Sequence, residues 1–211
     1  MAARLRHGVL VTLEGGEGSG KSSQAEALAD RLREGGYPVT LTCEPAGTRL
    51  GDTVKGVFQR GAVIPEAELF LFEAARAQHV EDVIRPAIER GDVVLCDRYT
   101  DSTLAYQGYG RGLSLDHVRA ANHIATRGLP PHFTILLDVP PETGLARKKG
   151  EAGTDSIGQE SPDFHQRVRD GFLALAEREP KRIAVVDASK PAAEVTEDAW
   201  RALQGFLDHL L

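Results

Sequence analysis

The residues whose types and spacing most clearly predict chemistry lie near the start of the chain, where glycines alternate with polar residues before a lysine and a serine. The stretch reads Gly15-Gly16-Glu17-Gly18-Ser19-Gly20-Lys21-Ser22 and matches the pattern Gly-x-x-x-x-Gly-Lys-Ser. In such a loop the glycines let backbone N–H groups turn toward phosphate oxygens, the lysine neutralises the β- and γ-phosphates, and the serine hydroxyl ligates Mg²⁺. The pattern predicts a phosphate-binding loop (P-loop) for a nucleoside triphosphate.

Two other interpretations of this stretch are weaker. A dinucleotide-binding loop needs a further glycine at position 23, where the chain has Ser23. A plain strand-to-helix turn with an incidental lysine is disfavoured, because an apolar run precedes the loop and a helical pattern follows it. The Asn-Lys-x-Asp motif for guanine is absent, so nothing favours GTP over ATP. We expect Lys21 to be catalytic, Ser22 to ligate the metal, and ATP to be bound by Gly15, Gly16, Glu17, Gly18, Ser19, Gly20, Lys21, Ser22 and Ser23.

The pair Asp97-Arg98 is a second candidate, because it ends the apolar run Val93-Val94-Leu95-Cys96. In a P-loop protein, an acid at the end of a buried strand can hold Mg²⁺ or position the acceptor. Arg98 beside it is suited to a second phosphate. The alternative, an aspartate that only caps a turn, is common in isolation and less favoured beside a P-loop.

These candidates must be positioned by secondary structure, and the chain alternates short apolar runs with amphipathic stretches. The runs predict buried parallel strands at 9–13, 39–43, 92–96, 133–139 and 183–187. Helices are predicted directly after the loop, over 66–90 with a break or kink at Pro86, and at about 114–127, 163–178 and 192–210. This alternation predicts an α/β fold of the P-loop NTPase type, a three-layer α/β/α arrangement with a five-stranded parallel sheet. We expect one domain over residues 1–211.

Composition limits the classes of function. The formal net charge of −6 argues against nucleic-acid binding, which needs a basic surface. Cys43 and Cys96 lie in or at the end of apolar runs and are expected to be buried, reduced thiols rather than a disulfide. Neither a signal peptide nor an apolar run of membrane-spanning length is visible, so we expect a cytoplasmic protein without a membrane partner.

Several motifs together resemble the thymidylate kinase family of nucleoside monophosphate kinases, in its bacterial form. They occur in the family's order and cover nearly the whole chain: "LEGGEGSGKSSQ" (13–24), "EPAGT" (44–48), "LFEAARAQH" (71–79), "CDRYTDSTLAYQGYGRG" (96–112) and "RVRDGFLALAEREPKRIAVVDAS" (167–189). The resemblance implies transfer of the γ-phosphate of ATP to dTMP, giving dTDP and ADP, with Mg²⁺ as cofactor. It also implies a homodimer.

The resemblance further implies roles for individual residues. Phe72 and Arg76 are four residues apart and so neighbours on one helix face; the matching family residues stack on thymine and bond its carbonyl. Taken alone, Phe72 would be an ordinary core residue. Glu17 would contact the 3′-hydroxyl of dTMP, and Asp97 and Arg98 would position the metal and the acceptor phosphate. The full set implied for dTMP is Glu17, Phe72, Arg76, Arg98, Ser102, Tyr106 and Gln107.

A lid is expected over residues 147–161, because 148–162 lack periodicity and family members without a P-loop cation supply one from a lid. Arg147 is the candidate catalytic cation, the alternative being that Arg147-Lys148-Lys149 form a solvated basic helix end. For the loop itself, the alternative is an inert surface excursion. Four residues depart from the family pattern: Cys43, Ala46, Ser156 and Gly158.

Two rival functions remain. One is a kinase for another small acceptor, such as a deoxynucleoside or a different monophosphate. The other is a nucleotide-dependent switch or partition-type ATPase that acts on a protein or DNA partner.

Overall fold

A parallel sheet of five strands organises the chain in the computed structural model, which describes residues 7–61, 63–148 and 157–210. The strands lie in the order β2-β3-β1-β4-β5, and every neighbouring pair runs parallel. Their bounds are β1 (Val9–Glu14), β2 (Val39–Cys43), β3 (Val93–Asp97), β4 (Phe133–Asp138) and β5 (Ile183–Asp187). The predicted strands and their parallel arrangement are confirmed, each end lying within one residue of its predicted position.

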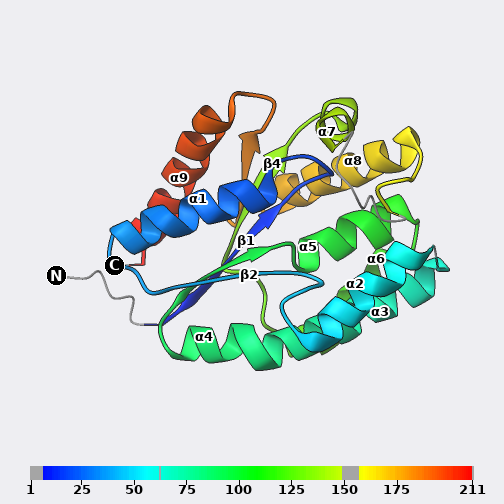
Figure 1. Ribbon diagram of the computed structural model, residues 1–211, viewed down its shortest axis with the longest axis horizontal. Helices are drawn as coiled ribbons and strands as arrows, with labels where there is room; N and C mark the ends of the chain where they lie inside the picture. The colour runs from blue at the N-terminus through cyan, green and yellow to red at the C-terminus, as the bar shows by residue number, and fades with distance from the viewer. Residues whose placement is uncertain (1–6, 62, 149–156, 211) are drawn as a thin grey trace.

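Helices cover both faces of the sheet, which confirms the three-layer α/β/α architecture. Alternate side chains of β1 point to opposite faces: Val9, Val11 and Leu13 pack with α1 (Lys21–Glu34) and α9 (Ala192–Asp208), whereas Leu10 packs with the helical segments on the other face. Figure 1 shows α1 and α9 together on one side of the sheet and α4 on the other. A sheet covered on both faces explains why its strands read as nearly continuous apolar runs.

The other helical segments complete the order of elements. The α-helices are α2 (Arg49–Arg60), α3 (Pro65–His79), α4 (Arg85–Glu89), α5 (Thr100–Thr103), α6 (Leu115–Thr126), α7 (Pro141–Lys148) and α8 (Pro162–Arg178). Two segments have the wider π-helical geometry, η1 (Val80–Ile84) and η2 (Leu104–Gly110). The predicted helices at 114–127, 163–178 and 192–210 correspond to α6, α8 and α9.

The predicted helix at 66–90 is present, but it does not break at Pro86. The backbone stays helical from α3 through η1 into α4, with Pro86 in the first turn of α4. Proline lacks an N–H and its ring clashes with the carbonyl of residue i−4 in a regular α-helix. A π-helical turn directly before it widens the helix and accommodates both effects.

Three helical segments were not predicted: α2, the pair α5 and η2, and α7. Each contains or adjoins glycines, such as Gly51 and Gly56 in α2 and Gly144 in α7, which weaken a helical pattern in the sequence. Thr48 nevertheless caps α2, its hydroxyl accepting a hydrogen bond from the Gly51 N–H at 3.0 Å.

Both cysteines are free, Cys96 fully buried and Cys43 partly buried, which confirms the expectation of two unpaired thiols. Among the helices of the described residues, none has the length and apolar character to cross a membrane.

Candidate active site

A cavity of about 1190 Å³ lies where the loops after β1, β2 and β3 meet, beside the carboxyl ends of these strands. Ligand pockets for one small molecule usually measure roughly 300–1,000 Å³, so this cavity has room for two nucleotides. Among the predicted site residues, all but Gly15 and Gly16 line it: Glu17, Gly18, Ser19, Gly20, Lys21, Ser22, Ser23, Phe72, Arg76, Asp97, Arg98, Ser102, Tyr106, Gln107 and Arg147. The fold thus brings together residues from the P-loop, from α3, from the segment that runs from β3 to η2, and from α7.

The glycine-rich loop joins β1 to the first turn of α1, with Gly20 capping the helix at a φ of 89°. Gly15 packs against β4, where a Cβ would lie 2.5 Å from the Leu137 carbonyl oxygen. The Lys21 ammonium is buried and donates to the carbonyl oxygens of Gly15 at 3.1 Å and Gly16 at 2.8 Å. Burial and the nearby Arg98 lower the pKa of Lys21 to about 8. The ammonium and the helix N-terminus together make this loop a binding site for anions.

Ser22 and Asp97 form a pair at the edge of the loop. The Ser22 hydroxyl donates to Oδ2 of Asp97 at 2.6 Å, whereas the buried Oδ1 of Asp97 has no hydrogen-bond partner. Within the described part of the chain, no three His, Cys, Asp or Glu side chains gather as they would around a fully protein-bound metal. Mg²⁺ usually takes one or two protein ligands and fills its shell with phosphate oxygens and water, so one hydroxyl and one free carboxylate oxygen fit it.

Glu17 lies inside the loop, yet its carboxylate is surrounded by cations. Its Oε1 accepts from Arg98 at 2.7 Å and from the Tyr106 hydroxyl at 3.0 Å, and its Oε2 accepts from Lys148 at 2.5 Å. Burial alone would raise the pKa of Glu17, but Arg98, Lys21 and Lys148 together hold it well below its ordinary value. Glu17 is therefore ionised, and it balances cations that would otherwise repel one another.

Arg98 occupies a backbone conformation that residues with side chains rarely adopt, with a φ of 71°. Its N–H donates to the Leu13 carbonyl at 3.0 Å, and its guanidinium lies 5.1 Å from the centre of the Tyr106 ring. Strained backbone of this kind persists where the surroundings hold it and is concentrated at functional sites. The strain aims the Arg98 guanidinium back toward the P-loop.

The far end of the cavity is aromatic. Phe72 is half-buried and stacks on Phe58, with ring centres 4.6 Å apart and planes inclined by 13°. Gln107 also lines this end, and its amide nitrogen donates to Glu68 at 2.7 Å. This combination suits a planar ligand with polar edges.

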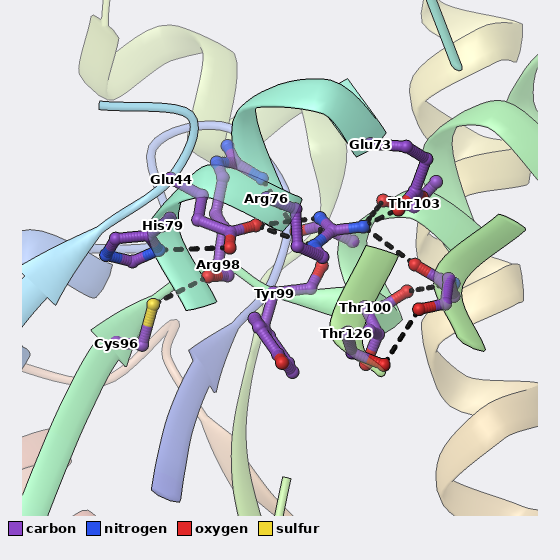
Figure 2. A network of polar contacts seen from close by, with 12 residues as sticks. Glu44, Glu73, Arg76, His79, Cys96, Arg98, Tyr99, Thr100, Thr103 and Thr126 are labelled. Carbon is purple, nitrogen blue, oxygen red and sulfur yellow. Dashed lines mark hydrogen bonds and ion pairs between the residues drawn. The ribbon is translucent and has the colours of Figure 1, made fainter. Parts of the chain in front are cut away.

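Arg76 lies beside this end, within the polar network of Figure 2. Its side chain is only 3% exposed. Its guanidinium donates to the carboxylates of Glu44 and Glu73, to Thr103 Oγ1, Asn122 Oδ1 and the Tyr99 carbonyl. Every N–H of the guanidinium therefore has an internal partner. His79 extends the network, with Nδ1 3.1 Å from Glu44 Oε1 and Nε2 2.7 Å from Thr42 Oγ1.

The helix α7 joins the P-loop to the opposite wall of the cavity. A Cβ at Gly144 would lie 2.1 Å from the Glu17 carbonyl oxygen, so the two backbones touch. Arg147 donates to the carbonyls of Ala188 at 2.9 Å and Ser189 at 3.4 Å, in the loop after β5. Of the expected lid, residues 149–156 lie outside the described part of the chain, including the departure at Ser156.

Comparison with known proteins gives one consistent result. The family model described as thymidylate kinase matches residues 13–199. The chain belongs to the thymidylate kinase family. It is 53% identical to the thymidylate kinase of Thermomicrobium roseum over 192 residues, which is 90% of this chain and 91% of that protein. It is 48% identical to that of Deinococcus radiodurans over 201 residues, covering 94% and 98% of the two chains.

A solved structure agrees with these relatives. The crystal structure of thymidylate kinase from Ehrlichia chaffeensis superposes with a TM-score of 0.77 and 32% sequence identity, covering 93% of this chain and 99% of that one. The resemblance stated from the motifs and the P-loop NTPase fold are both confirmed.

Several residues that contact the site are missing from the predicted set, among them Glu14, Glu44, Phe58, Thr103 and Lys148. Lys148 lies four residues after Gly144 on α7, so both contact Glu17 from the same helix face. The only signal for Glu14 is a carboxylate at the end of an otherwise apolar strand. Glu44 and Thr103 lie inside motifs of the family, but their contacts with Arg76 depend on the folded chain.

Proposed function

We propose that this chain is a nucleoside monophosphate kinase that transfers the γ-phosphate of ATP to dTMP and forms dTDP and ADP. The observation that carries the proposal is the single cavity in which the P-loop, the pair Asp97-Arg98 and the aromatic end with Phe72 meet. Phosphoryl transfer needs two substrates held in line and charge neutralised between them more than it needs covalent chemistry. A cavity with a cationic centre and room for two nucleotides meets both needs.

The donor end would be the P-loop. Lys21 would leave the Gly15 and Gly16 carbonyls and bind the β- and γ-phosphates, because a dianion is a stronger partner than a carbonyl. Ser22 and Asp97 would hold Mg²⁺, which when bound neutralises phosphate charge. Arg147, on the cavity wall, is the proposed catalytic cation of a lid over residues 147–161.

The acceptor end would bind dTMP. Arg98 would bind its phosphate, Phe72 would stack on the base opposite Phe58, and Tyr106 would pack against the sugar and exclude a 2′-hydroxyl. Glu17 would accept a hydrogen bond from the 3′-hydroxyl, and Ser102 and Gln107 would face the base. For Arg76 to bond a base carbonyl, one present partner must give way, and the Thr103 hydroxyl is a neutral partner that also lines the cavity.

The same proposal includes a homodimer located in the cytoplasm. Among the described residues, the three most exposed large apolar side chains are Ile124, Ile64 and Phe70, at 76%, 68% and 66%. They lie in α6, directly before α3 and in α3, two helices that pack against each other. Three exposed apolar side chains on neighbouring helices support a contact with a second copy of the chain.

The proposal is tested by ADP production from ATP and Mg²⁺ with one acceptor at a time: dTMP, dUMP, ribothymidine monophosphate, dCMP and dGMP. We expect fast turnover with dTMP, weaker turnover with dUMP, and little with the ribonucleotide. Turnover that is faster with another monophosphate would assign a different acceptor. Hydrolysis that no acceptor stimulates would instead point to a protein partner.

A further inference from the structure

Glu14 is a fully buried acid to which the proposed mechanism gives no task. It is the last residue of β1 and has 0% exposure. Its Oε1 accepts the backbone N–H of Tyr99 at 2.8 Å and that of Ser102 at 3.3 Å. Its Oε2 lies 2.5 Å from the Ser102 hydroxyl oxygen. Glu14 thus contacts the turn that follows Arg98 at three points.

These contacts bear on the position of Arg98. The positive φ of Arg98 is unfavourable for a residue with a side chain, so neighbouring interactions must hold it. The Arg98 N–H donates to Leu13, and the N–H groups of Tyr99 and Ser102 donate to Glu14. The end of β1 therefore holds the backbone that presents both Arg98 and Ser102 to the cavity.

The protonation of Glu14 also sets the direction of the Ser102 hydroxyl. A hydroxyl donates one hydrogen bond and accepts two. Ser102 Oγ already accepts from Arg98 Nη1 at 3.4 Å. If Glu14 is ionised, the Ser102 proton must point to it. If Glu14 is protonated and donates, both acceptor positions of Ser102 are filled and its own proton is free to point into the cavity.

The surroundings of Glu14 favour the protonated form at neutral pH. Burial and repulsion from Asp101 of α5 raise the pKa of Glu14 to about 8, against the Ser102 hydrogen bond and the attraction of Arg98. Lys21 from α1 and the neutral thiol of Cys96 from β3 are the other ionisable groups near it. Asp101 itself is ion-paired with Arg182 at 2.7 Å.

We propose that Glu14 is a positioning residue of the acceptor site, which as a neutral carboxylic acid holds Ser102 so that the serine hydroxyl donates a hydrogen bond to an oxygen of the acceptor nucleotide. This inference rests on the proposed function. Above the pH at which Glu14 ionises, the hydroxyl turns back to Glu14 and the acceptor loses this contact.

The test is the dissociation constant of dTMP, measured by calorimetry between pH 7 and pH 9 for the unmodified protein, Glu14→Gln and Ser102→Ala. With one proton leaving near pH 8, the constant of the unmodified protein should rise about tenfold over this range. The dissociation constant of Glu14→Gln should change much less over this range, because a carboxamide N–H donates to Ser102 at every pH. Ser102→Ala should bind more weakly at pH 7 and lack the same rise.

Both variants retain Lys21 and the dTMP phosphate, and Ser102→Ala also retains the Glu14 charge that acts on Lys21, so a rise caused by Lys21 would persist in Ser102→Ala. An equal tenfold rise in Glu14→Gln would overturn the inference and leave the proposed function intact. Absence of dTMP binding at any pH would overturn both.

A second measurement keeps the inference testable if a variant binds poorly. The folded-state pKa of Glu14 is raised above its unfolded value, so its favourable contribution to stability is lost as pH rises from about 4.5 to about 8. Glu14→Gln does not titrate and should gain thermal stability relative to the unmodified protein over that window. Glu197→Gln, the same change at a surface ion pair with Arg31, should show no such gain. No gain in Glu14→Gln would contradict a neutral Glu14.

Discussion

At the scale of single residues, the site depends on cations held close together by one carboxylate. Lys21, Arg98 and Lys148 all lie near Glu17, which is ionised and buried. From the sequence alone, an acid inside a phosphate-binding loop looks unfavourable. The acid is favourable because Arg98, after β3, and Lys148, in α7, pair with it, and no local sequence pattern connects these two residues to the loop. Residue types and spacing therefore predict the loop and the Asp97-Arg98 pair, but not the network that joins them.

Lys21 is the residue whose loss should be most costly for turnover. Lys21→Ala removes the buried cation of the P-loop and should lower kcat/KM for ATP by about 10²–10³, equivalent to roughly 3–4 kcal/mol of transition-state stabilisation. Steady-state kinetics with dTMP saturating would measure it. Lys181→Ala, an exposed lysine in the turn before β5, is the matched control and should retain full activity. Near-normal turnover of Lys21→Ala would remove this lysine from the mechanism.

At the scale of elements, the backbones of α7 and the P-loop touch directly, in addition to the ion pair between Lys148 and Glu17. Gly18 and Gly144 meet so closely that a Cβ on Gly18 would lie 2.0 Å from the Gly144 carbonyl oxygen. A glycine inside a helix normally costs about 0.5–1 kcal/mol relative to alanine, so Gly144 weakens the predicted helix while the tertiary contact requires it. This is the physical reason why α7 was missed: the cause of its glycine lies more than a hundred residues away in the sequence.

Gly144→Ala tests this contact. The new methyl group must push α7 away from the Glu17 backbone, which displaces Lys148 and Arg147 with it. We expect a loss of about tenfold or more in kcat/KM together with lower thermal stability. In α9, a Cβ at Gly205 meets nothing within 4 Å, so Gly205→Ala should leave activity unchanged and raise stability slightly. Equal effects of the two substitutions would show that the α7 contact is unimportant.

At the scale of the whole molecule, the fold class could be predicted because buried parallel strands and amphipathic helices have different patterns of apolar residues in the sequence. The strand order β2-β3-β1-β4-β5 was not specified by those patterns, since it depends on which crossover each helix makes. The cavity then follows from the topology: in parallel sheets, loops at the carboxyl ends of the strands meet on one edge. Every predicted side chain that must face a ligand comes from that edge or from a helix beside it.

The outer surface carries a prediction of its own. Phe70→Arg in α3 and Ile124→Arg in α6 place a charge on two of the three most exposed large apolar positions among the described residues and should convert a homodimer into monomers. Light scattering coupled to size-exclusion chromatography measures the molar mass directly. Val185→Arg alters another exposed apolar residue, 50% exposed in the edge strand β5, and should not change the mass. A monomer before any substitution would contradict the predicted dimer.

Glu17 has a thermodynamic consequence as well as a structural one. It belongs to the loop proposed to hold the donor, while its carboxylate contacts Arg98 and Tyr106, which are proposed to bind the acceptor. If binding of one nucleotide moves the loop, the contacts available to the second nucleotide therefore change. Coupling between two binding equilibria is reciprocal, so whatever factor ATP applies to the affinity for dTMP, dTMP must apply to the affinity for ATP. Binding of each substrate would in this way change the affinity for the other before any phosphate is transferred.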